Sequence, residues 1–212
     1  SMAPTADAAV QRFDGRYTAS YKGLSASARM TLTPARNGSW MYLLTVDHML
    51  AKLSQATVFQ DMGTQYRPLG GSDRTSYASI QRGVITNYNW AAGQARWSGD
   101  VKPSRAGPVA LRAGDMDALL INLALARDVP ANRPLSYRMI ENGRARPMNY
   151  RVIGRERVTI AGRTYDATKV AQGGAEKQTI AWIVAGIPAP VRIVQRENGA
   201  TTISLQMNSW SR

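Results

Sequence analysis

The sequence predicts an all-β protein: a strongly curved antiparallel sheet of consecutive hairpins, closed as a barrel or folded as a clam, with one buried α-helix near residues 115–127. Apolar and polar residues alternate over most of the chain from Phe13 onward, which is the side-chain period of a β-strand. Glycine-containing pairs such as Asn37-Gly38 and Gly173-Gly174 separate the alternating segments, as hairpin turns do. A sheet with one apolar face has to curve around a core, so the pattern favours a barrel-like architecture.

Length and composition indicate one domain. The chain has 212 residues, a length that β-barrels commonly reach undivided. We expect residues 1–11 to form a flexible lead-in and residues 12–212 to form a single barrel-like domain. Hydrophobic residues make up 44% of the chain, which is enough for a sizeable core. The longest apolar run, Ala118 to Ala126, is about half of the roughly 20 residues that a membrane-spanning helix needs, so a water-soluble protein is expected.

The first residues point to export. Ser1 and Met2 resemble a cloning remnant, and the segment Ala3 to Asp7 resembles the start of a mature chain after signal-peptide cleavage. We therefore expect a periplasmic protein from which the signal peptide has been removed.

One segment departs from the strand period. Asp115 is expected to cap the N-terminus of a helix, with Asp117 in its first turn, where carboxylates are favoured. The apolar residues that recur at helical spacing are Met116, Leu119, Leu120 and Leu123. Because the other side of this segment is apolar too, the helix should be buried on most sides.

Side-chain parity predicts how the C-terminal strands pair. In the segment Met148 to Ile160 the even positions are mostly apolar and the odd positions polar. A two-residue turn at Ala161-Gly162 would match this even face to the odd face of the next strand, placing Glu156 opposite Ala167.

The two following hairpins are predicted in the same way. A tight turn at Gly173-Gly174 would place Tyr165 opposite Trp182. A three-residue loop, Glu197 to Gly199, with Gly199 left-handed, would match the odd apolar positions of the last two strands.

This pairing suggests a candidate ligand-binding face. Aromatic and ionisable side chains fall together on the predicted inner face of the C-terminal hairpins, where polar groups can orient a ligand within an apolar cavity. These candidate ligand-binding residues are Tyr150, Glu156, Tyr165, Lys169 and Trp182. Glu156 and Lys169 are predicted to be diagonal neighbours, either as a polar anchor for a ligand or as a buried ion pair that sets the register.

The charge balance favours anionic partners. Lys and Arg number 27 and Asp and Glu 14, which gives a formal charge of +13. Arg151, Arg155 and Arg157 fall on the face opposite the aromatic residues and are candidates for contact with an anionic membrane surface. Because the aromatic side chains lie on the other face, a nucleic-acid groove is not expected. The alternative is that the charge only maintains solubility.

The inventory of reactive residues argues against catalysis. The chain has no Cys, which excludes disulfides, thiolate metal sites and Cys nucleophiles. The only histidine, His48, lies on an apolar parity and is expected to be half-buried in the core. One histidine without cysteine does not suffice for a zinc site, and Glu156 has no evident second carboxylate for glycosidase chemistry. We expect no catalytic residues, no metal and no cofactor.

Several short motifs are spread over nearly the whole chain. They are Tyr17-x-x-x-Tyr21-x-Gly23, Tyr88-Asn89-Trp90, the Asp117 to Leu125 segment, Tyr150-x-Val152-x-Gly154-x-Glu156, Gly162-x-x-Tyr165-x-Ala167-x-Lys169-Val170, and Trp182 with Pro190-Val191-Arg192-Ile193. Together these motifs resemble the domain-of-unknown-function 3108 family of exported bacterial envelope proteins. The resemblance implies an envelope location and a β-rich, barrel-like fold, and it supplies no catalytic residues.

These observations lead to a ranked set of functions. The first is a non-catalytic periplasmic envelope protein that binds an amphipathic or lipid-like ligand, or an envelope component, in or on a curved sheet. The alternative is a structural protein–protein scaffold with a fully packed interior. A nucleic-acid or anionic-glycan binder is a more distant alternative. The volume of the interior separates the first two, because a carrier needs an open apolar cavity and a scaffold does not.

Overall fold

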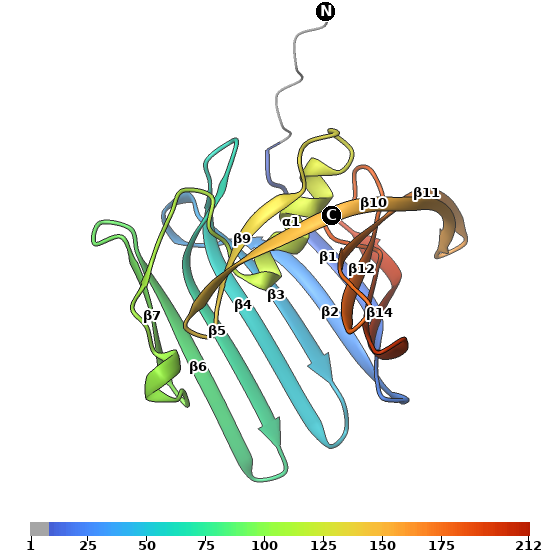
Figure 1. Cartoon of the computed structure of the whole chain (residues 1–212). Coiled ribbons are helices and arrows are strands. Elements are labelled where there is room, and N and C mark those ends of the chain that lie inside the picture. Colours follow the sequence, from blue (N-terminus) through green and yellow to red (C-terminus); the bar gives the residue numbers. More distant parts are fainter. Residues whose placement is uncertain (1–8) are drawn as a thin grey trace, which may run out of the picture.

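The protein forms a single curved antiparallel sheet that is not closed into a barrel. A computed structural model describes residues 9–212 and contains a 14-stranded sheet in the order β8-β7-β6-β5-β4-β3-β2-β1-β14-β13-β12-β11-β10-β9. Figure 1 shows the strands wrapping around the helix α1, with β9 and β10 crossing over it. The predicted all-β architecture with one helix is confirmed, and the sheet remains open between its two edge strands.

The elements follow one another along the chain with short connections. The strands are β1 (Phe13–Tyr21), β2 (Leu24–Pro34), β3 (Trp40–Asp47), β4 (Ala51–Asp61), β5 (Tyr66–Tyr77), β6 (Ile80–Asn89), β7 (Gln94–Gly99), β8 (Val109–Ala110), β9 (Ser136–Glu141), β10 (Arg144–Ile160), β11 (Arg163–Gly173), β12 (Lys177–Ile183), β13 (Arg192–Glu197) and β14 (Ala200–Ser211). The helix α1 spans Ala118–Asp128, and Arg36–Gly38 and Pro103–Arg105 form short 3-10 turns.

The helix is buried against the concave face of the sheet. It contacts β3, β4, β5 and β9, and Leu120 and Leu125 are fully buried in the same core as Tyr42 and Phe59. The edge strand β9 is covered on its outer side, because the main chain of Met116 pairs with it through Arg138 and Ile140. Covering an exposed sheet edge in this way limits pairing with other chains.

The start of the helix differs from the prediction. Asp117, not Asp115, is the N-cap, and its side chain accepts a hydrogen bond from the Leu120 amide at 2.8 Å. Asp115 is buried instead in the preceding turn, where it accepts from the Arg112 amide at 2.8 Å and pairs with Arg138 at 2.6 Å. Both aspartates suit a cap by residue type, and only the tertiary pairing with Arg138 separates their roles.

The registers of the C-terminal hairpins are partly as predicted. Glu156 lies opposite Ala167, which confirms the two-residue turn between β10 and β11. Trp182, however, lies opposite Lys169 and not opposite Tyr165. The cause is a longer loop: Gly173 and Gln178 are the last paired residues, and four residues lie between them. Since the error is an even number of residues, the face of each side chain in β12 is unaffected.

The last hairpin has a shorter loop than predicted. Glu197 pairs directly with Ala200, so the turn contains only Asn198 and Gly199, both with positive φ. The prediction assigned one extra residue to the loop, but this residue lies in a β-bulge next to Arg196. The apolar sets therefore still meet on one face.

A second bulge has a larger consequence for the predicted site. In β10, Val152 pairs with Val170 and Gly154 with Lys169, so Ile153 has no partner in β11. A residue inserted in one strand reverses the faces of all residues beyond it. The predicted shared face for Tyr150 and Glu156 is therefore wrong, because these residues lie on opposite sides of the β10–β11 layer.

Two further points concern the chain as a whole. The predicted tag remnant and most of the predicted lead-in, residues 1–8, lie outside the described residues. Within residues 9–212, no helix is both long and apolar enough to cross a membrane.

Candidate functional site

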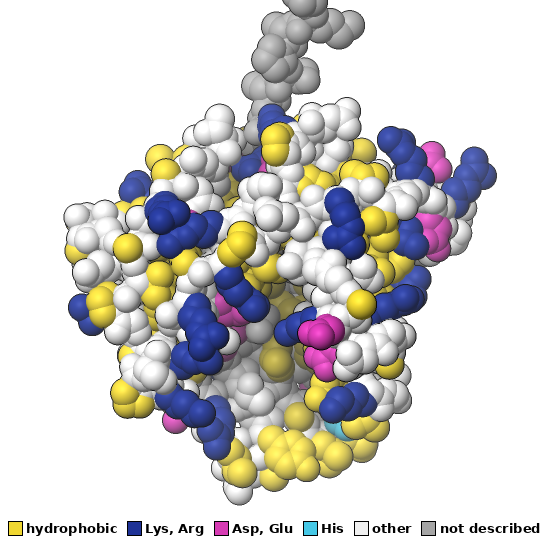
Figure 2. All heavy atoms as spheres, in the orientation of Figure 1, with side chains coloured by type: hydrophobic (Ala, Val, Ile, Leu, Met, Phe, Trp, Pro, Cys, Tyr) yellow, Lys and Arg dark blue, Asp and Glu magenta, His cyan; other side chains and the backbone are white. Residues whose placement is uncertain are grey.

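The concave side of the sheet contains a hollow that α1 does not fill. Figure 2 shows this depression below the centre of the molecule, bounded by the sheet on both sides. On β3, the side chains that face the helix are the buried Tyr42 and, further along the strand, Leu44 and Val46. Val46 pairs with Leu53 of β4, so Leu53 lies on the same side of the sheet. Leu44, Val46 and Leu53 are only half-buried. The sheet therefore presents partly uncovered apolar surface to the hollow.

The opposite wall of the hollow comes from the C-terminal strands. Ile193 of β13 pairs with Leu205 of β14, and Leu205 pairs with Ala19 of β1, which places all three on the concave face. Ile193 is half-buried and packs against the main core. Nearer the strand ends, the same face carries the polar side chains of Thr179 and Gln195. By the same register, Lys177 and Glu197 follow on this face at the strand ends. The two walls thus combine apolar patches with a few polar and charged groups, as ligand cavities usually do.

The inner end of the hollow is acidic. A small pocket of about 30 Å³ lies where α1 begins, and the residues around it include Gln55, Asp73, Asp117 and Glu141. The hydroxyl of the buried Thr57 donates a short hydrogen bond to Asp117. A volume of this size holds about one water molecule, so the pocket is a polar recess of the hollow and not a ligand cavity by itself.

Burial raises the pKa of the carboxyl groups at this end of the hollow. Burial raises the pKa of Asp117 to about 6, against the lowering effect of its hydrogen bonds with Thr57 and Leu120. Burial also raises the pKa of Glu141, while Arg146 and Lys177 act in the opposite direction. Lys177 belongs to β12, so one of the charges that lower the pKa of Glu141 comes from the C-terminal strands.

A buried hydroxyl accompanies these carboxyl groups. Tyr88 of β6 is 5% exposed, and among residues 9–212 its hydroxyl has no hydrogen-bond partner. Burial, followed by the negative charges of Asp117 and Glu141, raises the pKa of Tyr88. An unpaired buried hydroxyl is costly, so the inner end of the hollow keeps an unsatisfied polar group.

Three of the predicted ligand-binding residues form a cluster. The indole nitrogen of Trp182 donates to Glu156 at 3.0 Å, and the Lys169 ammonium lies 3.7 Å from the same carboxylate. The Lys169 nitrogen also lies 5.1 Å from the centre of the Trp182 ring, and the Arg192 guanidinium approaches that ring to 4.6 Å. The hydrogen bond from Trp182 and the charge of Lys169 lower the pKa of Glu156.

This cluster is more open than the sequence suggested. The predicted ion pair is present, but 44% of the Glu156 side chain and 29% of the Lys169 side chain are exposed. The interpretation as a buried pair is therefore wrong. Of the three side chains, only Trp182 is buried.

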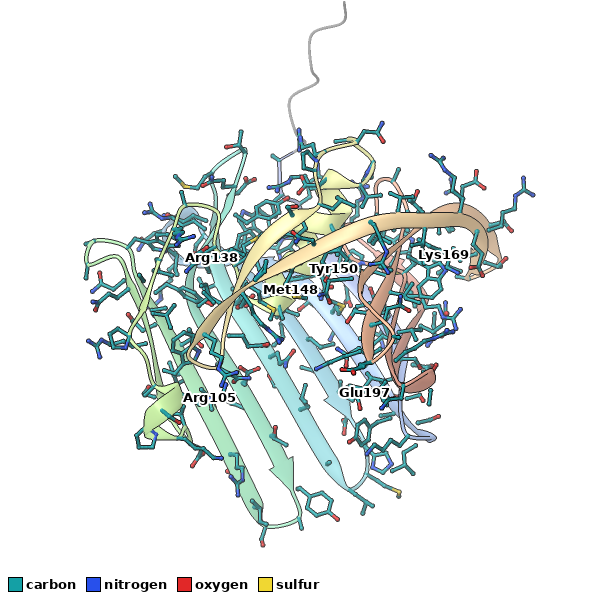
Figure 3. The ribbon with its side chains drawn as sticks, viewed as in Figure 1. Arg105, Arg138, Met148, Tyr150, Lys169 and Glu197 are labelled. Carbon is teal, nitrogen blue, oxygen red and sulfur yellow. The ribbon has the colours of Figure 1, made fainter. Side chains whose placement is uncertain are left out.

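The other two predicted residues lie elsewhere. Tyr150 packs its ring 6.2 Å from that of Tyr137, beside the core, and Tyr165 lies under the guanidinium of Arg163 at 5.1 Å. Figure 3 shows Tyr150 near the centre of the molecule and Lys169 well to the right of it. The bulge at Ile153 separates Tyr150 from the cluster.

The predicted arginine face is also divided. Arg151 precedes the bulge and donates to the Gly173 carbonyl at 3.1 Å, so it faces away from Arg155 and Arg157. Arg157 forms an exposed ion pair with Asp166 at 3.6 Å, which reduces its free charge. The single face of three arginines is therefore wrong as a geometric prediction.

Neither the single histidine nor the acidic side chains form a metal site within residues 9–212. His48 lies in the turn between β3 and β4, half-buried, where its Nδ1 accepts from the Leu50 amide at 3.1 Å. No group of three or more His, Cys, Asp or Glu side chains within residues 9–212 is arranged to hold a metal ion.

A second depression lies mainly on the other face of the sheet. This outer groove has a volume of about 640 Å³ and crosses β3 to β6. By register, most of its lining side chains, among them Thr45, Ser54 and Arg74, face away from the helix. Val46 and Leu53, which occupy concave-facing positions, also border this groove. Lys52 and Arg74 make the groove cationic, and Ile85 gives it an apolar patch.

Sequence reasoning missed the acidic end of the hollow. Asp73, Asp117 and Glu141 come from β5, the start of α1 and the end of β9, so no sequence spacing joins them. The alternation of side chains along β5 could have indicated one of these residues, because Asp73 lies on the inward side of the strand with Gly71 and Thr75.

Comparison with solved structures identifies the same architecture elsewhere. The beta-barrel-like protein of domain of unknown function DUF1849 from Brucella abortus superimposes with a TM-score of 0.60 at 8% identity, covering 94% of this chain and 97% of that one. The MucA/MucB complex of Pseudomonas aeruginosa gives a TM-score of 0.44 at 13% identity over 94% of this chain and 51% of that one. The first comparison shows a shared fold and nothing further. No curated protein matches the sequence.

The family comparison covers almost the whole sheet. The profile described as "Protein of unknown function (DUF3108)" matches residues 16–206, from β1 to β14. The chain belongs to the DUF3108 family.

Proposed function

We propose that this protein is a non-catalytic, periplasmic component of the cell envelope that binds an amphipathic, lipid-like ligand in the hollow of its open sheet. The observation that carries the proposal is the partly uncovered apolar surface of Leu44, Val46 and Leu53 on the concave face, of which the helix covers only a part. Apolar side chains left accessible inside a concavity favour burial of a hydrocarbon group.

The walls and the inner end of the hollow suit the two parts of an amphipathic molecule. The apolar walls offer contact to an acyl chain, whereas Asp117 and Glu141 offer hydrogen-bonding groups at the inner end. The family resemblance adds an expectation of an envelope location. The small number of candidate catalytic groups supports a binding role over an enzymatic one.

Lipid extraction and rebinding test this proposal. Native mass spectrometry of protein purified from its own envelope should reveal a bound amphipathic molecule, and a fluorescent fatty acid should bind the delipidated protein. Leu44→Trp places a large ring in the hollow, away from the outer groove, and should weaken binding about tenfold or more through lost space for the ligand. Thr18→Trp is the matched control, because Thr18 is exposed on the opposite face of β1.

A variant in the outer groove distinguishes ligand binding there from ligand binding in the hollow. Ser54→Trp fills this outer groove and leaves the concave face unaltered. If Ser54→Trp abolishes binding and Leu44→Trp does not, the ligand lies outside the hollow and the proposal is wrong. If neither the native protein nor the delipidated protein binds an amphipathic molecule, the scaffold alternative replaces it.

A further inference from the structure

Three hairpin tips at one end of the sheet expose large apolar side chains. Neighbouring strands in an antiparallel sheet alternate in direction, so the β1–β2, β3–β4 and β5–β6 connections lie together, at the bottom of Figure 1. Each tip carries two such residues, and together they form what we call the apolar rim. Its members are Tyr21, Leu24, Met49, Leu50, Tyr77 and Ile80.

Exposure of the rim is high and concentrated. The least exposed member, Tyr21, is 53% accessible, and Met49 at the central tip is 92% accessible. Within residues 9–212, the rim accounts for six of the ten large apolar side chains that are exposed. Singly scattered apolar residues are normal on a protein surface, whereas a contiguous group marks a contact surface.

The opposite end of the same strands lacks this feature. Among residues 9–212, the β2–β3 and β4–β5 connections there carry one exposed large apolar residue, Met62. From β1 to β6 the sheet therefore has an apolar end and a more polar end. Hairpin tips need only glycine or polar turn residues to form, so the apolar residues of the rim are not required by the turns themselves.

Cationic side chains adjoin the rim. Lys22 lies within the β1–β2 tip and contacts the Tyr21 ring at 5.4 Å, and Arg82 follows Ile80 by two residues on β6. Lys52 follows Leu50 closely, although Asp47 pairs with it in register and offsets its charge. Figure 2 shows Lys and Arg side chains above the apolar lower edge. Apolar and tyrosine side chains beside lysine and arginine are the composition that enters the interface of an anionic bilayer.

We propose that the apolar rim docks this protein on an anionic phospholipid membrane. Met49 and Leu50 enter the interfacial region, while Lys22 and Arg82 contact the lipid phosphates. The surface differs from the face of Arg151, Arg155 and Arg157 that the sequence suggested. Figure 2 shows the hollow bordered below by this rim, so docking turns that border toward the bilayer. The proposal does not require a ligand in the hollow.

A site-specific fluorescent probe tests the docking directly. Because the chain contains no Cys, Met49→Cys and Met62→Cys each provide a single labelling position at opposite ends of the sheet. Each variant is labelled with an environment-sensitive dye and mixed with vesicles of phosphatidylcholine alone or with phosphatidylglycerol. We expect a blue shift and quenching by a lipid-borne quencher for the Met49 probe, only with the anionic vesicles, and no change for the Met62 probe.

Vesicle sedimentation with unlabelled variants completes the test. The double variant Met49→Ser, Leu50→Ser should lose about tenfold in affinity, and Lys22→Ser should lose roughly fivefold at low salt. Unchanged thermal unfolding of these exposed-residue variants would show that the fold is retained. The double variant Arg155→Ser, Arg157→Ser should bind like the unaltered protein.

Other results would overturn the proposal. Absence of binding to anionic vesicles would do so, as would binding that depends on Arg155 and Arg157 while the Met49 probe remains in water. A Met49 blue shift that grows with protein concentration in the absence of vesicles would show that a second copy of the chain covers the rim instead.

Discussion

Substitutions at Asp117 separate two contributions to stability: the electrostatic cost of a charge at the inner end of the hollow and the benefit of capping the helix. The Asp117 carboxylate accepts from the Leu120 amide at 2.8 Å and from the hydroxyl of Thr57, and its pKa is raised from 3.8 to about 6 by burial. Asn at this position can still cap the helix, because Asn and Asp are equally good N-cap residues, but it carries no charge. We therefore expect Asp117→Asn to be at least as stable as the unaltered protein at pH 7.

The sign and size of the effect follow from proton linkage. Since the folded pKa of Asp117 lies above the unfolded one, the folded state binds more protons between about pH 4 and pH 6, and stability falls as the pH rises through that window. A shift from 3.8 to about 6 corresponds to roughly 3 kcal/mol at neutral pH, as an upper bound for a half-buried group. Asp117→Asn should remove this dependence. Asp117→Ala, which also loses the cap, should cost about 1 kcal/mol at pH 4.5.

Urea unfolding between pH 4.5 and pH 7.5 measures these quantities. The informative value is the difference in the free energy of unfolding between the unaltered protein and Asp117→Asn at each pH, because other raised groups such as Glu141 contribute equally to both. A difference that stays constant over the range would show that Asp117 is already ionised at low pH. The raised pKa of Asp117 would then be wrong.

Further predictions concern the core, a buried hydrogen bond and the ion pair. Leu120→Ala should lower the free energy of unfolding by about 2–5 kcal/mol, because Leu120 is fully buried between helix and sheet, and an unchanged urea midpoint would place the helix outside the core. Tyr17→Phe removes the hydroxyl that donates to the Pro190 carbonyl at 2.8 Å and should cost about 1 kcal/mol, measured by the same unfolding assay. A double-mutant cycle with Glu156→Gln and Lys169→Met should give a coupling energy of about 1 kcal/mol or less, since both side chains are partly exposed, whereas several kcal/mol would mean that the pair is buried in solution.

The alternation of side chains along each strand depends on local sequence alone, and it made several features predictable. Glu156 was placed near Lys169 because a two-residue turn and a period of two leave little freedom in the β10–β11 register. The burial of Leu120 followed from a helix that is apolar almost all round. The face of Trp182 also survived an error in loop length, because the error was an even number of residues.

Features that depend on one inserted residue, or on segments far apart in the chain, were decided only by the tertiary structure. The bulge at Ile153 has no distinctive sequence, yet it moves Tyr150 away from Glu156 and Arg151 away from Arg155. The meeting of Asp117 with Glu141 requires the start of α1 to lie against the end of β9. Whether the sheet closes depends on its total curvature, which sums small twists over all strands and is not set by any single residue pattern. Openness of the sheet is what leaves the concave hollow accessible, so the candidate site is a property of the whole fold.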